Sequence, residues 1–174
     1  MSENPKAVPV VGIVMGSKSD LGVMGEAGGL LTSFGVPFEM LIASAHRDPE
    51  KVASYAKDAE SKGLKIIIAG AGMAAHLAGA LAASTTLPVI GVPIQSGPLL
   101  GLDALLSTVQ MPSAVPVATV AVNGAKNAAY LAIQILSLND SELRQKFQNF
   151  KKQQKAQVES ANAELQAERV LGAP

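Results

Sequence analysis

The stretch Val8–Met15 (VPVVGIVM), followed at once by Gly16–Asp20 (GSKSD), decides the fold of this chain. A nearly continuous run of apolar and β-branched residues is typical of a strand buried on both faces of a parallel sheet. In the next five residues, glycine permits a tight turn, two hydroxyls can donate to phosphate oxygens, and Asp20 can cap a helix or accept from a sugar hydroxyl. We predict a buried strand that ends in an anion-binding turn, with a plain capped turn as the alternative.

Apolar strands and helical segments alternate along the rest of the chain. Strands are predicted at 8–15, 38–43, 64–69, 89–93 and 115–122, and helices at 21–34, 48–62, 99–110, 124–138 and from Asp140 to Glu168. This alternation indicates an α/β fold, a doubly wound five-stranded parallel sheet with right-handed connections. For 174 residues we expect strand order 2-1-3-4-5 and a single domain, with a core at about 8–138 and a C-terminal helical arm at about 140–168.

The last predicted helix differs from the others in its polarity. Leu143, Phe147 and Phe150 lie on one face at its start, but beyond Lys151 it is polar nearly all round. Such a helix is either a solvated projection or an arm that lies on a neighbouring subunit.

The composition excludes several classes of function. The chain is 48% hydrophobic and 16% charged, its formal net charge is zero, and it contains no cysteine. A nucleic-acid binder would normally carry a basic excess, and without cysteine there is no disulfide framework, thiol nucleophile or thiolate metal site. Because so few charges accompany so apolar a chain, we expect other subunits to cover much of its surface, in a homo-oligomer.

The first residues and the lengths of the apolar runs indicate the cellular location of the protein. Met1–Lys6 is polar and lacks the apolar centre of a signal peptide. No apolar run approaches the roughly 18 residues that a bilayer span needs. We therefore expect a cytoplasmic protein with no membrane partner.

Ser44–Arg47 (SAHR) forms a second candidate turn, between a short apolar run and a helix start. Asp48 is a good N-cap and Pro49 suits the first helical position, so His46 and Arg47 stand on a strand-to-helix turn. Histidine exchanges a proton readily near neutral pH, and arginine binds phosphate bidentately. The alternative is a partly buried turn histidine beside a surface arginine that forms a salt bridge.

The third predicted strand leads into Gly70–Gly79 (GAGMAAHLAG), a run of small residues that holds the only other histidine. Its Gly-x-Gly-x-x-Ala matches the dinucleotide-binding fingerprint in form, but the strand at 89–93 is followed by Gln95-Ser96 and offers no acid for a ribose. In the expected order, the turns after the first three strands lie beside the point where the strand order reverses. We expect one crevice there, lined by Ser17, Ser19, Asp20, Ser44, His46, Arg47, Gly70, Gly72 and His76.

The residue inventory limits the chemistry of this crevice. Two histidines without cysteine exclude an ordinary zinc site, although an aspartate-based magnesium site remains open. No Walker loop is present, and no spacing points to an acid that would orient a catalytic histidine in a Ser–His–Asp triad. The inference is a phosphorylated small molecule that undergoes acid–base chemistry without a metal or a redox cofactor.

Six motifs in a fixed order then suggest a family. They are Gly16–Asp20 (GSKSD), Ser44–Arg47 (SAHR), Gly70–Gly79 (GAGMAAHLAG), Gly91–Ser96 (GVPIQS), Gly101–Leu105 (GLDAL) with Val109–Pro112 (VQMP), and Lys126–Ala128 (KNA). In order and spacing, over about residues 9 to 150, they closely resemble the class I 5-(carboxyamino)imidazole ribonucleotide mutases of purine biosynthesis. The resemblance implies a flavodoxin-like three-layer αβα subunit, a homo-octamer and no cofactor. It also implies an isomerase that converts 5-(carboxyamino)imidazole ribonucleotide to 4-carboxy-5-aminoimidazole ribonucleotide.

The resemblance also implies a role for each site residue. His46 would be the general acid and base for decarboxylation and recarboxylation, and Asp20 would hold the ribose hydroxyls. The 5′-phosphate would be held by Ser17, Ser44 and Arg47, with Ser19 supporting the first loop. The Gly70–His76 loop, with Gly72 and His76, and the pair Gln95-Ser96 would enclose the carbon dioxide pocket and hold the base.

The chain departs from the family pattern in places, and two rival functions remain. The family usually has glycine where Met73 stands and proline where Ala78 stands, so a thioether enters the loop beside the carboxylate. One rival is the sister carboxylase that uses carbon dioxide directly, which carries lysine where Arg47 stands and a polar loop in place of 72–75. The other is a non-catalytic flavodoxin-like nucleotide-binding module; an aromatic content of 3% disfavours flavin stacking.

Overall fold

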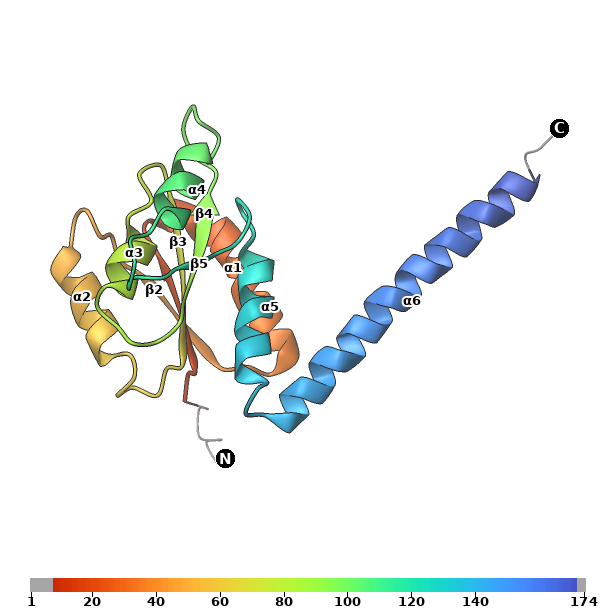
Figure 1. Cartoon of the computed structure of the whole chain (residues 1–174), viewed down its shortest axis with the longest axis horizontal. Coiled ribbons are helices and arrows are strands. Elements are labelled where there is room, and N and C mark those ends of the chain that lie inside the picture. Colours follow the sequence, from red (N-terminus) through yellow and green to blue (C-terminus); the bar gives the residue numbers. More distant parts are fainter. Residues whose placement is uncertain (1–7, 172–174) are drawn as a thin grey trace, which may run out of the picture. The chain divides into compact units, whose positions relative to one another are not determined.

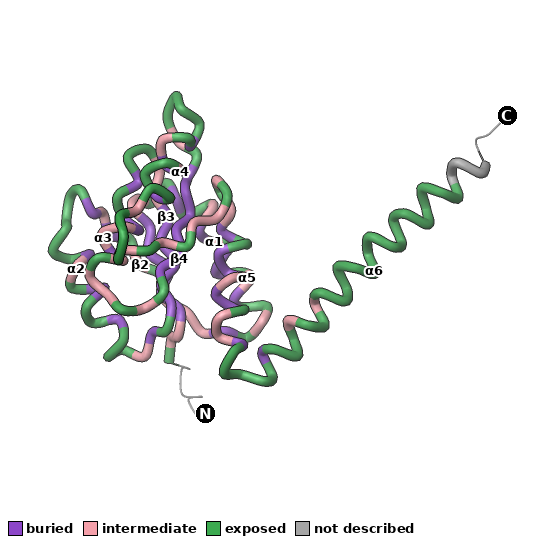
Figure 2. The backbone as a smooth tube through the Cα atoms, viewed as in Figure 1, coloured by how far each residue is buried: buried purple, intermediate pink, exposed green. Residues whose placement is uncertain are grey.

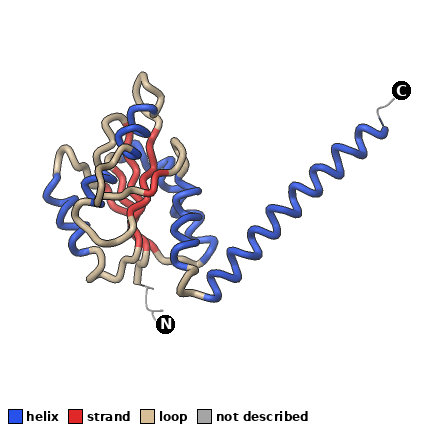
Figure 3. Tube along the Cα trace, in the orientation of Figure 1, coloured by secondary structure: helices blue, strands red, loops and turns tan. Residues whose placement is uncertain are grey.

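The computed structural model describes residues 8–171, and the side chains of residues 8–167. Five strands form one parallel sheet: β1 (Val11–Met15), β2 (Phe38–Ile42), β3 (Ile66–Gly72), β4 (Val89–Ile94) and β5 (Ala118–Thr119). Their order is β2-β1-β3-β4-β5, which confirms the predicted topology. Figure 3 shows the strands in red, with helices beside them. The sheet therefore has the strand reversal beside β1 that the prediction of the crevice required.

Helices cover both faces of this sheet (Figure 1). They are the 3₁₀ turn η1 (Lys18–Asp20) and the α-helices α1 (Leu21–Phe34), α2 (Pro49–Asp58), α3 (Leu77–Ala82), α4 (Leu102–Val109) and α5 (Ala125–Leu136). On one face α1 and α5 meet, where Phe34 and Tyr130 pack edge to face with ring centroids 6.2 Å apart. On the other face lie α2, α3 and α4, and a Cβ added at Gly91 of β4 would contact Ala78 of α3 and Thr108 of α4. The three-layer αβα arrangement is thus confirmed.

The core is concentrated in the inner strands, as Figure 2 shows. All residues of β1 and β4 are buried, and Ile66, Ile67 and Ile68 of β3 are fully buried. The edge strand β2 has only intermediate and exposed residues. A strand that is covered on both faces needs apolar side chains at successive positions. This is why the continuous apolar runs in the sequence identified the inner strands.

Some element boundaries differ from the prediction. β3 continues three residues beyond 69, because Ala69 to Gly72 pair with Gly91 to Ile94 of β4. The fifth strand, predicted over 115–122, is reduced to Ala118–Thr119 at the sheet edge, after two prolines that cannot donate backbone hydrogen bonds. The helix predicted from residue 99 begins at 102, because Leu100 and Gly101 have left-handed φ values of 52° and 92°.

The strand register brings the carboxyl ends of three strands together. Met15 pairs with Ile42 on one side and with Gly70 on the other. One residue later, the Gly16 N–H donates to the Gly70 carbonyl (3.1 Å) and the Ala43 N–H donates to the Met15 carbonyl (2.9 Å). The turns that follow β1, β2 and β3 therefore start at one edge of the sheet.

The chain contains two compact units, Met1–Ile133 and Gln134–Pro174. The second holds α6 (Ser141–Leu171), whose start is capped by Asp140, since its Oδ1 accepts from the Leu143 N–H at 2.9 Å. Side chains from 151 to 167 are exposed, consistent with the polar pattern that predicted a C-terminal helix. Within the described residues, no helix combines the length and hydropathy that a bilayer span requires.

Candidate active site

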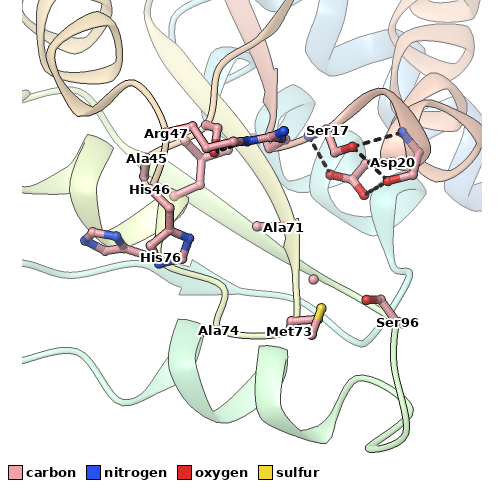
Figure 4. A pocket seen from close by; sticks show the side chains of 15 residues that line it. Ser17, Asp20, Ala45, His46, Arg47, Ala71, Met73, Ala74, His76 and Ser96 are labelled. Carbon is pink, nitrogen blue, oxygen red and sulfur yellow. Dashed lines mark hydrogen bonds between the residues drawn. The ribbon is translucent and has the colours of Figure 1, made fainter.

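A cavity of about 530 Å³ lies at the carboxyl edge of the sheet (Figure 4). Eight of the nine residues expected in the crevice line it: Ser17, Ser19, Asp20, Ser44, His46, Arg47, Gly72 and His76. The rest of the lining is Gly16, Ala45, Ala71, Met73, Ala74, Leu77 and Ser96. Residues from the ends of four strands thus converge on one space.

In the turn after β1, hydrogen bonds among Ser17, Ser19 and Asp20 hold these three side chains in fixed positions. Ser17 is the N-cap of η1, and its N–H donates to Oδ2 of Asp20 at 3.0 Å. The Ser19 hydroxyl donates to Oδ1 of the same carboxylate at 3.2 Å and to Oγ of Ser17 at 3.0 Å. Although Asp20 is only 7% exposed, it lines the cavity. Its remaining lone pairs can accept hydroxyl groups of a ligand.

The turn after β2 places a guanidinium beside this network. The Asp48 N–H donates to the Ser44 carbonyl at 2.8 Å, and Oδ1 of Asp48 caps α2 by accepting from the Lys51 N–H at 3.1 Å. Arg47 donates from Nε to Oγ of Ser44 and from Nη2 to the carbonyl of Gly16, each at 3.3 Å. Arg47 and Gly16 are 31 positions apart in the sequence, so this hydrogen bond places the guanidinium at the end of β1. A guanidinium and the hydroxyls of Ser17 and Ser44 form a suitable site for a phosphate.

The two histidines of the chain meet in this cavity. The ring centroids of His46 and His76 lie 5.0 Å apart, with the planes tilted by 41°. His46 follows β2 and His76 precedes α3, and both are exposed. An imidazole that solvent and ligand can both reach is suited to proton transfer near neutral pH.

Two predicted residues, Gly70 and Gln95, do not line the cavity. Gly70 belongs to β3, and its carbonyl accepts from the Gly16 N–H. Gln95 is bound to Asn123. Its backbone N–H donates to Oδ1 of Asn123 at 2.8 Å, and its Oε1 accepts from Nδ2 of Asn123 at 3.4 Å. Ser96 lines the cavity instead. The sequence alone could not reveal this, because Asn123 lies 28 positions away.

Several apolar lining residues were not predicted as site residues. Ala45, Ala74 and Leu77 line the cavity beside the predicted polar groups, and Met73 does so in the same loop. Met73 and Ala74 belong to the run of small residues after β3, where the loop approaches the turn at Ser96. A Cβ added at Gly72 would lie 3.0 Å from Cβ of Ser96 and 3.1 Å from the Ile94 carbonyl oxygen.

The charges of the cavity are few. Its lining contains one carboxylate, one guanidinium and two imidazoles. Among the side chains of residues 8–167, no group of three or more His, Asp or Glu residues is arranged to hold a metal ion. The arrangement can bind an anion and a sugar at one end and transfer a proton at the His46 imidazole.

Comparison with known proteins identifies relatives over most of the chain. The AIR carboxylase family profile matches residues 10–157. The chain is 56% identical over 158 residues to the N5-carboxyaminoimidazole ribonucleotide mutase of Pyrococcus horikoshii, covering 91% of this chain and 89% of that protein. It is 51% identical over 158 residues to the protein of the same name from Mycobacterium tuberculosis, covering 91% of each. It is also 54% identical over 150 residues to the phosphoribosylaminoimidazole carboxylase of Saccharomyces cerevisiae, covering 86% of this chain but 26% of that protein.

The fold comparison agrees with these sequence matches. The crystal structure of Treponema denticola PurE superimposes with a TM-score of 0.83 at 32% identity, covering 90% of this chain and 98% of that one. The predicted resemblance is therefore confirmed by sequence and by fold. Together these matches show that the chain belongs to the AIR carboxylase family.

Proposed function

We propose that this chain converts 5-(carboxyamino)imidazole ribonucleotide to 4-carboxy-5-aminoimidazole ribonucleotide in purine biosynthesis. The observation that carries the proposal is the convergence of Ser17, Asp20, His46 and Arg47 on one cavity in a chain more than half identical to named mutases. Because substrate and product are isomers, the reaction requires no net electron transfer. The enzyme is thus an isomerase that moves a carboxyl group within one molecule.

The polar end of the cavity would bind the ribonucleotide. Arg47, Ser17 and Ser44 offer a guanidinium and two hydroxyls to the 5′-phosphate, with Ser19 holding the first loop in place. The Arg47–Gly16 hydrogen bond supports this role, because it keeps the cation at the end of β1, beside the turn that holds Ser17. Asp20 would accept the ribose hydroxyls, since Ser17 and Ser19 already hold its carboxylate in position.

His46 would act as acid and then as base. As the bond between the exocyclic nitrogen and the carboxylate breaks, its electron pair stays on nitrogen, which takes a proton from the imidazolium. Carbon 4 of the resulting aminoimidazole then attacks the carbon dioxide, and a carbon–carbon bond forms. The neutral imidazole removes the proton from carbon 4 and restores the aromatic ring. One group suffices because His46 gives one proton to the exocyclic nitrogen and later takes one proton from carbon 4.

His76, Gly72 and Gln95 complete the proposed site. The 5.0 Å separation of the histidine rings supports a role for His76 in orienting the catalytic imidazole. Gly72 permits the close approach of its loop to Ser96. Gln95 would act through its hydrogen bonds with Asn123, by supporting the turn that presents Ser96.

The principal alternative is direct carboxylation of 5-aminoimidazole ribonucleotide by carbon dioxide. The Saccharomyces relative carries that name and is 54% identical over the matched segment. Both reactions yield the same product, so the substrate distinguishes them. Purified protein is incubated with each ribonucleotide in turn, the second with bicarbonate, and the product is followed. We expect conversion of the carboxyamino compound to be much faster, and the reverse preference would favour the carboxylase.

We also propose that the protein is a homo-octamer that acts in the cytoplasm. In each subunit, residues 1–174 would form one domain with a C-terminal helical arm. An exposed apolar surface on and before α4 supports assembly: Leu99, Leu100, Leu102, Leu106 and Val109 are 48–67% exposed. Subunits that pack on this surface would remove it from water. The absence of cysteine is compatible with a reducing compartment. Light scattering on the protein as it elutes from a size-exclusion column measures the mass of the assembly. The mass of a single subunit would contradict the proposed homo-octamer.

A further inference from the structure

Asn123 binds the end of β4 from outside the cavity. The last strand, β5, ends at Thr119, but the chain continues beside β4, and the Asn123 N–H donates to the Pro93 carbonyl at 2.8 Å. Just past the end of β4, the Asn123 side chain continues this pairing, because its Oδ1 accepts from the Gln95 N–H at 2.8 Å. Asn123 therefore extends the hydrogen bonding of β4 beyond the last residue of β5.

The contacts of the Asn123 amide fix its orientation. A backbone N–H can only donate, so the side-chain atom bonded to the Gln95 N–H is the amide oxygen. The Nδ2 group then faces the Gln95 side chain and donates to its Oε1 at 3.4 Å. One side chain thus binds both the backbone and the side chain of Gln95.

The backbone of Asn123 has a left-handed conformation. Its φ is 58°, and among non-glycine residues in the described part of the chain only Met73 (55°), Leu100 (52°) and Ala114 (72°) also have positive φ. Asparagine is enriched several-fold in this region, but the conformation persists only where the surroundings determine it. The three hydrogen bonds with Pro93 and Gln95 supply such surroundings.

The turn that follows β4 is held from two sides. On the side of β3, Gly72 pairs with Ile94, and a Cβ added at Gly72 would lie 3.1 Å from Oγ of Ser96. On the other side, Asn123 binds Gln95, the residue directly before Ser96. Ser96 lines the cavity, whereas Asn123 does not. Asn123 thus fixes the backbone next to a cavity residue without lining the cavity itself.

Ser96 brings a hydroxyl to a part of the cavity that is otherwise small and apolar. In Figure 4 it lies on the same side as Met73, away from Arg47. A hydroxyl can both donate and accept, so Ser96 can bind a polar edge of an aminoimidazole ring while Arg47 binds the phosphate. The position of this hydroxyl depends on the turn that Asn123 holds.

We propose that Asn123 is a positioning residue of the reaction, which holds the Gln95 backbone so that the Ser96 hydroxyl stays in place to bind the imidazole base. This inference rests on the proposed mutase function. Asn123 acts through Ser96 and has no contact of its own with the substrate. A displacement of about 1 Å can cost about 100-fold in rate, so the loss of these hydrogen bonds should be visible in kcat/KM.

The test removes the Asn123 side chain and keeps its backbone conformation. Glycine adopts a φ of 58° without strain, so Asn123→Gly should fold, and we expect kcat/KM for the carboxyamino ribonucleotide to fall about 10- to 100-fold. Asn123→Asp keeps an oxygen that accepts from the Gln95 N–H, and the Gln95 amide can turn to donate to the second oxygen. Its kcat/KM should therefore lie well above that of Asn123→Gly. Ala114→Gly, at an exposed residue with a φ of 72° outside the cavity lining, is the control and should match the natural protein.

A double-mutant cycle distinguishes the positioning of Ser96 from a general loss of structure. Ser96→Ala removes the hydroxyl through which Asn123 acts, so adding Asn123→Gly to it should lower kcat/KM by less than about twofold further. An equal loss from Asn123→Gly in both backgrounds would overturn the inference, as would natural activity in Asn123→Gly or an Asn123→Asp variant no better than it. Each of these outcomes leaves the mutase function intact. No conversion by the natural protein would instead overturn the function itself, and with it this inference.

Discussion

The two ends of the cavity are built in different ways. At the polar end, hydrogen bonds hold Ser17, Asp20 and Arg47 in place. At the other end, the loop at Gly72 and Met73 meets the turn at Ser96 and Gly97 through van der Waals contacts. The first end offers fixed hydrogen-bond donors and acceptors, whereas the second end offers closely packed small and apolar residues. His46 also lines the cavity, with its ring centroid 5.0 Å from that of His76.

The largest expected effect is that of replacing His46, the proposed proton-transfer residue of the cavity. His46→Asn should lower kcat about 10²- to 10⁴-fold, the usual contribution of general acid–base catalysis. The ribonucleotide should still bind, because the polar end is unchanged. Steady-state kinetics and calorimetric titration with the product measure the two effects. A non-catalytic nucleotide-binding module would show no turnover in either form, and unaltered turnover in the variant would assign the proton transfer elsewhere.

The next effect tests the polar end. Arg47→Ala should weaken product binding by about 1.5–3 kcal/mol, the range for hydrogen bonds to charged groups. This corresponds to about a 10- to 100-fold higher Kd. Titration calorimetry on the variant measures it. Lys57→Ala, which removes an exposed cation of α2 outside the cavity lining, serves as the control and should leave the Kd unchanged. If both substitutions weakened product binding equally, Arg47 would contribute only the general electrostatic attraction between a cation and the product.

A smaller effect tests the close packing at the apolar end. Gly72→Ala should lower the free energy of unfolding by about 1–3 kcal/mol, the usual cost of overpacking. The reason is that the new Cβ would meet the Ile94 carbonyl oxygen and Cβ of Ser96 within 3.1 Å. Denaturant unfolding measures this change. Gly29→Ala in α1, where an added Cβ meets nothing within 4 Å, should instead stabilise the protein by about 0.5–1 kcal/mol. A neutral Gly72→Ala would show that the two loops can separate freely.

The smallest effect concerns strain at the same end. Met73→Gly should stabilise the protein by about 0.5–1 kcal/mol, because relief of the left-handed conformation, about 1–2 kcal/mol, exceeds the extra entropy of the unfolded glycine. For a chain of this length each 1 kcal/mol raises Tm by about 2–4 °C. Thermal unfolding at a fixed protein concentration measures the shift. A lower Tm would mean that the contacts of the Met73 side chain outweigh its strain.

Much of the fold followed from local patterns. The helix predicted at 21–34 matches α1, since Gly35 at φ 75° ends it in the left-handed conformation that glycine favours. The strand order followed from alternating segments and chain length, and eight of the nine residues expected in the crevice line one cavity because the turns after parallel strands share an edge. The extra residues of β3 did not follow, because they depend on pairing with β4.

The sequence by itself determined the buried strands, the Asp48 cap of α2, and the residue types of an anion site with a proton-transfer group. These features depend on hydrophobic periodicity and on hydrogen bonds between residues close in the chain. The first turn differs from the prediction, because Ser17 caps η1 and the Asp20 side chain does not cap α1. Only the tertiary structure decided that Arg47 reaches Gly16, that Asn123 holds Gln95 away from the cavity lining, and that Met73 spans the gap to Gly97. Each of these contacts joins residues at least 24 positions apart, so it exists only once the strands have paired and brought distant turns together.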